Sequence, residues 1–406
     1  MIQKETISQV IGEQKSKIRF TGSLPRELLP DLPKLNTHAL IISGIRRCGK
    51  STLLIQVLKQ EHKNALYLNF DDPRLFNFEL ADFRLLDSLI IEMNVKNLFF
   101  DEIQAINGWE RYVRQKLDEG YKVVVTGSNA SMLSRELGTK LTGRHLSKEL
   151  YPFSYTEFLS FNSLKANIAS WKKYTETGGF PEYVKTGNTD ILTTLFNDIL
   201  NRDIAVRHGI RDIHSMKRLS VYLVSNAGSL VSARKLAQPL GFKSPTTVLE
   251  YFSFLEDCYL INFMQKFCYS PRAQAINPKK IFVIDPGILS IASQSFSPNK
   301  GHLLENLVYW HFKRQGNELF YFQEKQGECD FVVFKNGKFK LAVQVCYELT
   351  LENSDREIRG LNEALAFFNS NSGIILTHNQ HDAYMHNGKM VEIKPVWEFI
   401  YNTKSK

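Results

Sequence analysis

The feature that most constrains this chain is a glycine-flanked run between a buried apolar stretch and a helical stretch. The run GIRRCGKS, residues 44–51, fits the pattern G-x-x-x-x-G-K-[ST] without a gap. The preceding HALIISG, residues 38–44, has the composition of a buried strand, and residues 51–60 have helical character. Glycines at such a junction let backbone N–H groups turn inward, and the helix N-terminus adds partial positive charge. The pattern therefore predicts a phosphate-binding loop.

Two side chains of this loop have expected roles. The Lys50 ammonium should reach the β and γ phosphates of a nucleotide, and the Ser51 hydroxyl should bind Mg²⁺. ATP and Mg²⁺ are therefore the expected cofactors. The alternative is a glycine-rich turn without a ligand. The residues expected to contact the nucleotide are Gly44, Ile45, Arg46, Arg47, Cys48, Gly49, Lys50, Ser51 and Thr52.

The chain around the loop alternates apolar runs with helical segments. Strands are expected over 38–44, 64–70, 95–103 and 121–128, with helices over 51–60, 84–92 and 109–119. Strands that alternate with helices indicate right-handed crossovers and a mostly parallel, doubly wound sheet of α/β class.

Two acids end the apolar run NLFF at residues 97–100. Asp101 and Glu102 should lie at the carboxyl edge of a strand that sits beside the strand of the loop, where Asp101 can hold the Mg²⁺ shell and Glu102 can polarise the attacking water. The alternative is a pair of exposed acids at the end of a strand. Gln104 follows and can face the same site.

The next strand ends in polar residues. Thr126, Ser128 and Asn129 should lie at the same edge, in reach of the γ-phosphate or of water. A Gly-Ser-Asn turn without a role at the site is the alternative.

The remaining chain divides by composition and pattern. A polar, partly Pro-rich lead-in precedes the loop domain, and a helical region follows it. A helix, a turn, a second helix capped by Ser244 and a strand then give a winged-helix pattern, and strands with two helices end the chain as a small α/β domain. The expected boundaries are 1–36, 37–153, 154–225, 226–277 and 278–406.

Composition excludes several classes of protein. The 406 residues are 43% hydrophobic and 23% charged, an ordinary balance for two or three globular domains. Five scattered cysteines without a CxxC pair favour reduced thiols, and we expect no signal peptide, no membrane span and a cytoplasmic location. The net charge of +9 favours an anionic partner, although so small a surplus over this length also suits a merely soluble protein.

Taken together, the motifs resemble a known family. They are NFDDPR, FFDEIQ, VVTGSNASML, LTGRHLSKELYPFSYTEF and TGGFPEYV, beside the loop GIRRCGKST. The chain looks like the bacterial and archaeal AAA-type P-loop ATPases that carry a C-terminal domain of unknown function related to PD-(D/E)xK nucleases. The resemblance runs from about residue 36 to residue 400.

The resemblance implies an AAA-type parallel sheet with helices on both faces, then a winged-helix domain and a small nuclease-like α/β domain. Asp101 and Glu102 would form the Walker B pair, and Asn129 would occupy the sensor position. Arg144 would stabilise charge at the γ-phosphate. A surface or ion-pair role for Arg144 is the alternative. Such ATPases often work as rings in which a neighbouring subunit supplies the arginine. The resemblance is therefore compatible with a homo-oligomer or with another protein partner.

The nuclease-like domain departs from its family's pattern. Its metal ligands would be Glu305 on a helix, Asp330 on a strand and the first residue of a Glu-x-Lys strand. That strand reads Gln344-Val345-Cys346, so a neutral amide replaces the acid and a thiol replaces the lysine. Glu348 alternates onto the same face and could restore one acid. The pattern predicts a degenerate site, kept for binding or packing.

DNA is the expected nucleic-acid partner if there is one. The second winged helix, from Ser244, carries little positive charge, with Lys243 at its start. A basic stretch before it is either a nucleic-acid surface or a solvated helix face; it comprises Arg207, His208, Arg211, Lys217 and Arg218.

The sequence thus favours a Mg-dependent ATPase that acts as a switch or motor. A DNA-binding module gated by ATP is the second hypothesis. An ATP-dependent nuclease is the third, and the residues at 344 and 346 count against it.

Overall fold

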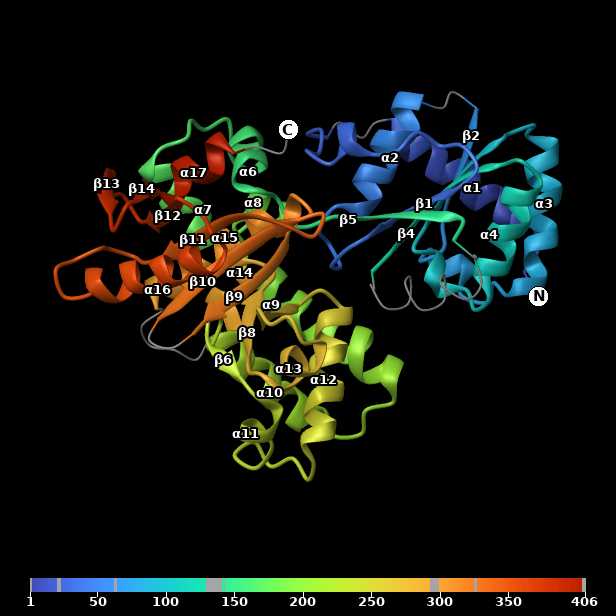
Figure 1. Ribbon diagram of the computed structural model, residues 1–406. Helices are drawn as coiled ribbons and strands as arrows, with labels where there is room; N and C mark the ends of the chain where they lie inside the picture. Colours follow the sequence, from blue (N-terminus) through green and yellow to red (C-terminus); the bar gives the residue numbers. More distant parts are fainter. Residues whose placement is uncertain are drawn as a thin grey trace. The chain divides into compact units, whose positions relative to one another are not determined.

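The computed structural model of the chain describes residues 2–19, 23–61, 64–128, 141, 143–292, 299–324 and 327–403 (Figure 1). The chain forms two compact units. Unit 1 comprises Met1–Tyr151 and Asp257–Tyr259, and unit 2 comprises Pro152–Glu256 and Leu260–Lys406.

In the part of unit 1 that the structure describes, five strands form one sheet in the order β2-β3-β4-β1-β5, and every neighbouring pair is parallel. The strands are β1 (Ala39–Ser43), β2 (Ala65–Asn69), β3 (Asn97–Asp101), β4 (Lys122–Gly127) and β5 (His145–Glu149). The expected parallel α/β sheet is confirmed. Edge strand β5 is not among the strands expected from the sequence, because its run HLSKE lacks the apolar character of a buried strand.

Helices cover both faces of this sheet. Alternate strand residues, such as Ile41, Leu68 and Phe100, join one core with the apolar sides of α1, α3 and α4. Helix α2 packs on the other face against β1, β3 and β4. The helices are α1 (Lys4–Arg19), α2 (Lys50–Glu61), α3 (Phe83–Glu92) and α4 (Trp109–Asp118), with short 3-10 turns η1 (Leu29–Asp31), η2 (Pro73–Leu75), η3 (Leu80–Asp82) and η4 (Ile103–Ala105).

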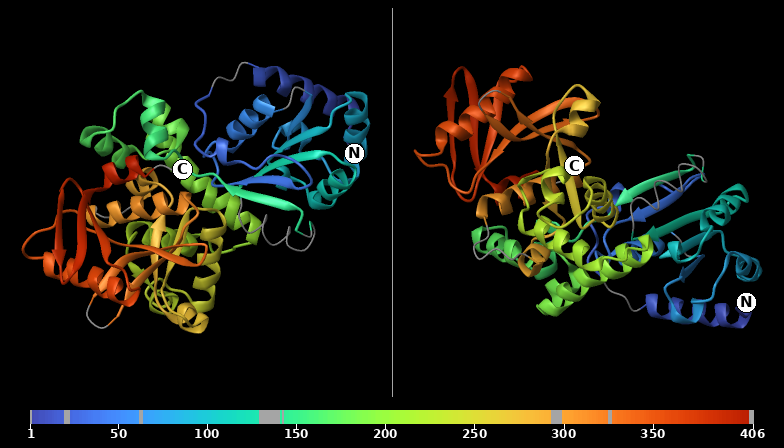
Figure 2. Two further views of the ribbon diagram at one scale, coloured as in Figure 1. Left: turned by 45° about the horizontal axis from the view of Figure 1, so that its top comes forward. Right: turned by 90° about the horizontal axis from the view of Figure 1, so that it is seen from below.

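The N-terminal lead-in is part of unit 1. Ile7, Val10 and Ile11 of α1 are buried in the same core as the sheet, and α1 lies along β2 and α3 (Figure 2). A spacing of three and four residues places these side chains on one helix face. The helix therefore contributes a layer of the fold.

The first part of unit 2 along the chain is helical, and the later part contains a mixed sheet. The helices are α6 (Tyr155–Asn162), α7 (Ile168–Thr177), α8 (Pro181–Thr186), α9 (Thr189–Asp198), the π-helical η5 (Ile199–Val206), α10 (Ile213–Ser225), α11 (Ala233–Ala237), α12 (Pro245–Asp257), α13 (Pro271–Ile276), α14 (Pro286–Ala292), α15 (Lys300–Arg314), α16 (Ser354–Phe367) and α17 (Val396–Asn402).

Within the described residues, the sheet of unit 2 has nine strands in the order β13-β14-β12-β11-β10-β9-β7-β8-β6. They are β6 (Leu230–Val231), β7 (Ile261–Lys266), β8 (Lys279–Val283), β9 (Glu318–Gln323), β10 (Glu328–Lys335), β11 (Lys338–Val345), β12 (Ser372–Thr377), β13 (Asp382–His386) and β14 (Lys389–Pro395). Helix α16 packs on β10, β11 and β12, where the smaller core of this part lies.

The sheet crosses the boundary expected between residues 277 and 278. Strand β8 pairs antiparallel with both β7 and β6, so it belongs with the preceding elements. A parallel pairing of β7 with β9 at Gln265–Phe320 and Lys266–Tyr321 then joins these strands to the C-terminal ones. The run KKIFVID, which contains β8, therefore belongs to the group of strands β6, β7 and β8 and not to the C-terminal group.

In the part of the chain that the structure describes, no helix is long and apolar enough to cross a membrane.

Candidate nucleotide site and a second acidic pocket

The predicted phosphate loop connects β1 to α2, as its flanking patterns indicated. Gly44 has a φ of +152°, and a Cβ there would lie 2.1 Å from the carbonyl oxygen of Leu150. Gly49 has a φ of +103°, a backbone conformation that L side chains rarely adopt. Both glycines of the motif are thus required by the path of the backbone.

An arginine from the N-terminal lead-in holds the backbone of the phosphate loop by hydrogen bonds. The buried Arg26 guanidinium donates to the carbonyl oxygens of Cys48 at 2.8 Å and Tyr151 at 2.7 Å, while its backbone N–H donates to Gln56. Sequence reasoning missed this residue, since nothing in the local pattern connects it to a loop 22 positions later. Charged donors to carbonyls fix backbone position strongly.

Lys50 begins α2, and the residue is 4% exposed. Its Nζ donates to the Ile45 carbonyl oxygen at 3.1 Å and lies 3.7 Å from Oε1 of Glu102. The ammonium thus lies inside the loop, beside Glu102, the residue that follows β3; in the sheet, β4 lies between β3 and the loop strand β1.

Asp101 is fully buried at the end of β3 and accepts several hydrogen bonds. Tyr67 Oη donates to it at 2.8 Å, and the Thr126 hydroxyl and the Ser51 hydroxyl also contact it. Burial, followed by the negative charge of Glu102, raises the pKa of Asp101. The predicted convergence of the loop serine and this acid at the sheet edge is therefore present.

Glu102 occupies a left-handed backbone position, with φ of 51°. This turn directs its backbone N–H to Thr126 Oγ1 at 2.9 Å, and Gln104 Nε2 donates to its carboxylate. Burial alone would raise the pKa of Glu102, but Lys50, Gln104 and Arg46 outweigh it and lower the pKa. The carboxylate therefore stays ionised beside the loop.

The end of β4 completes the described part of this edge. Thr126 is buried between Asp101 and Glu102, and Ser128 Oγ accepts from Gln104 Nε2 at 3.3 Å. Asn129, the expected sensor residue, lies outside the described residues.

Arg144 lies at the other end of the sheet. Its carbonyl oxygen accepts from Ala39, the first residue of β1, whereas the phosphate loop follows Ser43, the last. Its guanidinium contacts Asp118 on α4. The position does not bring Arg144 to the phosphate loop of its own chain, so within one chain Arg144 is an ion-pair residue.

The donors at the loop suit a magnesium nucleotide. The Ser51 hydroxyl and the Asp101 carboxylate are hard oxygen ligands of the kind Mg²⁺ prefers, and they already contact each other. The glycine backbone and Lys50 present positive charge for phosphate oxygens. The residues present therefore fit both expected cofactors.

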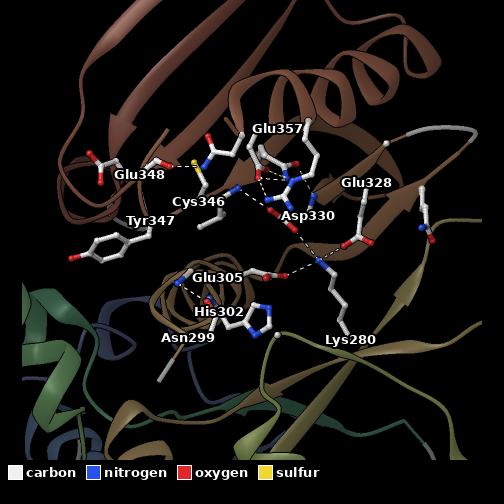
Figure 3. A pocket seen from close by; sticks show the side chains of 18 of the residues that line it. Lys280, Asn299, His302, Glu305, Glu328, Asp330, Cys346, Tyr347, Glu348 and Glu357 are labelled. Atoms are coloured by element: carbon white, nitrogen blue, oxygen red, sulfur yellow. Dashed lines mark hydrogen bonds and ion pairs between the residues drawn. The ribbon is translucent and has the colours of Figure 1, made fainter. Parts of the chain in front are cut away.

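A second charged site lies in unit 2, in a pocket of about 850 Å³ between α15, α16 and the ends of β8, β10 and β11 (Figure 3). Lys280 of β8 is 3% exposed, and its Nζ lies 2.8 Å from Glu305, 2.7 Å from Glu328 and 2.8 Å from Asp330. Burial alone would lower the pKa of Lys280, but the carboxylates raise it well above the usual range. The structure brings Glu305 and Asp330 together at Lys280, a residue that sequence reasoning missed.

The positions that depart from the nuclease pattern are also in this pocket. Gln344 Oε1 accepts from the backbone N–H of Asp330 at 3.2 Å, and its Nε2 donates to Glu357 of α16 at 2.6 Å. Burial raises the pKa of the Cys346 thiol to about 12. The acid beside Gln344 is thus Glu357, whereas Glu348 follows the end of β11 and is exposed.

Among the described residues, no group of three or more His, Cys, Asp or Glu side chains is arranged to hold a metal ion. The relation of this part to PD-(D/E)xK nucleases stays a prediction.

Comparison with known proteins supports a nucleotide-binding domain in unit 1. Residues 36–159 match a family described as an AAA domain, and residues 168–299 match a domain of unknown function (DUF8612). The solved structure of C. elegans PCH-2 aligns with 63% of this chain and 66% of its own, at 13% identity and a TM-score of 0.25. A TM-score this low adds nothing to the assignment.

Two curated relatives span most of the chain. An uncharacterized protein of Methanocaldococcus jannaschii is 35% identical over 394 residues, which cover 88% of this chain and 87% of that protein. An uncharacterized protein of Haemophilus influenzae is 31% identical over 333 residues, which cover 76% of this chain and 82% of that protein. The chain therefore belongs to the same family as these archaeal and bacterial proteins, and its residues 36–159 match the AAA domain family.

Proposed function

We propose that the chain binds Mg²⁺ and ATP at the phosphate loop of unit 1 and hydrolyses ATP there as a switch or motor. One observation carries this proposal: Lys50, Asp101 and Glu102 meet at one edge of a parallel sheet, with the loop serine against the first acid. This is the donor set that phosphoryl transfer requires.

Each side chain has a distinct task in this mechanism. Lys50 exchanges its Ile45 carbonyl for phosphate oxygens and stabilises charge that develops on them. Glu102, whose lowered pKa keeps it ionised, orients the attacking water and accepts its proton. Ser51 and Asp101 would hold Mg²⁺, which supplies further positive charge at the phosphates.

Arg144 would act on the nucleotide of a neighbouring copy. Its place at the amino end of β5, away from its own loop, and its partly exposed ion pair with Asp118 suit a residue presented to a partner. An Arg144→Ala chain should then bind ATP normally, hydrolyse it slowly and recover activity when mixed with a Lys50→Ala chain. Failure of the mixture to recover activity would reject the role in trans.

The deciding experiment is ATP turnover by the purified chain, with and without double-stranded DNA, beside Glu102→Gln. Turnover that disappears in the variant establishes hydrolysis at this site. No turnover by the native chain with retained ATP binding would reject the hydrolase and leave a nucleotide-gated switch. Lys50→Ala should not bind ATP, and retained affinity would reject the site itself.

DNA is the second candidate partner, as a ligand gated by ATP. The order α10-β6-α11-α12-β7-β8, with β8 between β6 and β7, supports a winged-helix assignment. Helix α12 carries no Lys or Arg over Pro245–Asp257. The phosphate contacts are therefore assigned to the exposed basic residues around α10. These are Arg207, His208, Arg211, Lys217 and Arg218.

DNA affinity should therefore fall steeply with salt and change with the bound nucleotide. A Lys217→Glu/Arg218→Glu chain should lose most of it while Lys243→Glu retains it. Turnover indifferent to DNA, with no salt-sensitive binding, would point to a protein partner.

A further inference from the structure

Three carboxylates surround the Lys280 ammonium. Those of Glu305, Glu328 and Asp330 lie within 2.8 Å of Nζ, and Nζ donates hydrogen bonds to Glu305 and Asp330 (Figure 3). Two of these acids come from β10 and one from α15, while the lysine comes from β8. Two elements thus direct acids at a cation that a third element supplies.

The position of Nζ is where a divalent ion would need to be. Glu305 and Asp330 are the two acids that the sequence assigns to metal binding, and both contact Nζ at 2.8 Å. An ion bridging the two carboxylates would coincide with the ammonium, because Mg²⁺ and Mn²⁺ ligands also lie close to the cation.

The neighbouring groups are arranged for a pocket without metal. Gln344 uses its amide oxygen and its amide nitrogen on Asp330 and Glu357, so the residue that replaces the second acid is already engaged. Asp330 Oδ2 accepts from the backbone N–H of Val345 at 2.9 Å. Cys346, in the position of the missing lysine, is a buried neutral thiol.

We propose that the Lys280 ammonium is the resident cation of this pocket: it takes the place of a divalent metal between Glu305 and Asp330, and its removal creates a divalent-cation site. The native pocket then needs no metal and performs no metal-dependent cleavage of DNA. This inference is independent of ATP hydrolysis in unit 1.

The test is Mn²⁺ binding to the nucleotide-free full chain, followed by electron paramagnetic resonance and calorimetry. Lys280→Met keeps most of the side-chain volume and removes the charge. It should bind one Mn²⁺ per chain, roughly tenfold or more tighter than the native chain. The second substitution Asp330→Asn should abolish this gain. Lys279→Met, the adjacent lysine outside the pocket lining, is the matched control and should behave as the native chain.

Three results would overturn the proposal. The first is Mn²⁺ binding by the native chain that Asp330→Asn removes. The second is a folded Lys280→Met chain that binds no more Mn²⁺ than the control. The third is a Lys280→Met chain that stays unfolded at saturating Mn²⁺, because a cation that fits the place would restore the missing charge. Unfolding without metal and recovery with Mn²⁺ would support the proposal.

Discussion

Lys50 in unit 1 and Lys280 in unit 2 are buried almost equally, at 4% and 3% exposed, but their surroundings differ. Among the residues that the structure describes, one carboxylate lies within ion-pair distance of Lys50, at 3.7 Å, whereas three lie within 2.8 Å of Lys280. The first ammonium also donates to a backbone carbonyl of its own loop.

The difference separates a lysine that can be redirected from one that is fixed. A carbonyl hydrogen bond and a long ion pair are weak enough for phosphate oxygens to replace. Three short carboxylate contacts in a buried pocket are not, because removing them leaves uncompensated charge. Burial alone therefore does not identify a ligand-binding lysine; the number and distance of its acidic partners do.

Removing the Lys50 ammonium should have the largest effect, and on function alone. We expect Lys50→Met to lower ATP turnover by roughly 10³-fold or more, since the side chain stabilises charge on the phosphates. Its free energy of unfolding should stay close to that of the native chain. Parallel assays of turnover and of urea unfolding measure both quantities. A large loss of stability would show that Lys50, like Lys280, holds the fold together.

The same substitution at Lys280 should have the opposite signature. Lys280→Met in metal-free buffer leaves three buried or partly buried acids without their cation, which costs on the order of 4 kcal/mol of unfolding free energy. ATP turnover of the molecules that remain folded should be unchanged. Urea unfolding followed by tryptophan fluorescence gives the value. A loss below 1 kcal/mol would show that the three contacts do not hold the pocket.

Substitution of Glu102 tests whether the acid beside Lys50 takes part in hydrolysis or only supports the fold. Glu102→Gln should lower turnover by roughly 10²–10³-fold, because an amide cannot accept the proton of the attacking water. ATP affinity should be retained, as Lys50 and the loop are intact. Single-turnover kinetics with a binding titration separate the two steps, and equal losses of binding and turnover would contradict the assignment.

Asp285 shows what a buried acid does when its direct partners are neutral. It accepts from the backbone N–H groups of Gly179 at 2.6 Å and Gly287 at 2.8 Å, and burial raises its pKa to about 6. A raised pKa in the folded state means that its contribution to stability is full below pH 4 and is lost as pH rises through 6. The change amounts to at most about 3 kcal/mol.

The measurement is the free energy of unfolding between pH 4 and pH 7, in the native chain and in Asp285→Asn. The difference between the two chains should vary with pH over this range as Asp285 ionises in the native chain. A difference that is constant with pH would mean that this carboxyl does not titrate there.

These sites differ in how far the sequence could predict them. The phosphate loop and the pair Asp101–Glu102 are each contiguous, and the parallel sheet brings their strand ends to one edge, so periodicity and motif suffice. Arg26 and Lys280 act 22 and 50 positions from partners they contact, and no local spacing records such a contact. The pairing of β8 with β7 and β6, which crosses the boundary expected at residue 278, is tertiary and cannot be read from local spacing for the same reason.

Gln104 should give the smallest effect and the finest test of the loop site. Its Nε2 donates to Glu102 and, at 3.3 Å, to Ser128, and its buried Oε1 has no hydrogen-bond partner among the described residues. The side chain thus holds the Glu102 carboxylate in one orientation and leaves one acceptor for a water or a ligand. We expect Gln104→Ala to lower kcat roughly tenfold, about 1.4 kcal/mol, without changing KM for ATP.

The pH profile of kcat distinguishes this positioning role from a loss of packing. Burial alone would raise the pKa of Glu102, and Gln104 is one of the groups that outweigh it. Without this donor the pKa of Glu102 should rise, so the acid limb of the profile should move to higher pH. Gln115→Ala, which removes an exposed glutamine bonded to Glu119 on the surface, is the control and should leave kcat and the profile unchanged. If Gln104→Ala lowers kcat without moving the acid limb, Gln104 supports the fold of the turn, and Lys50 and Arg46 set the charge state of Glu102.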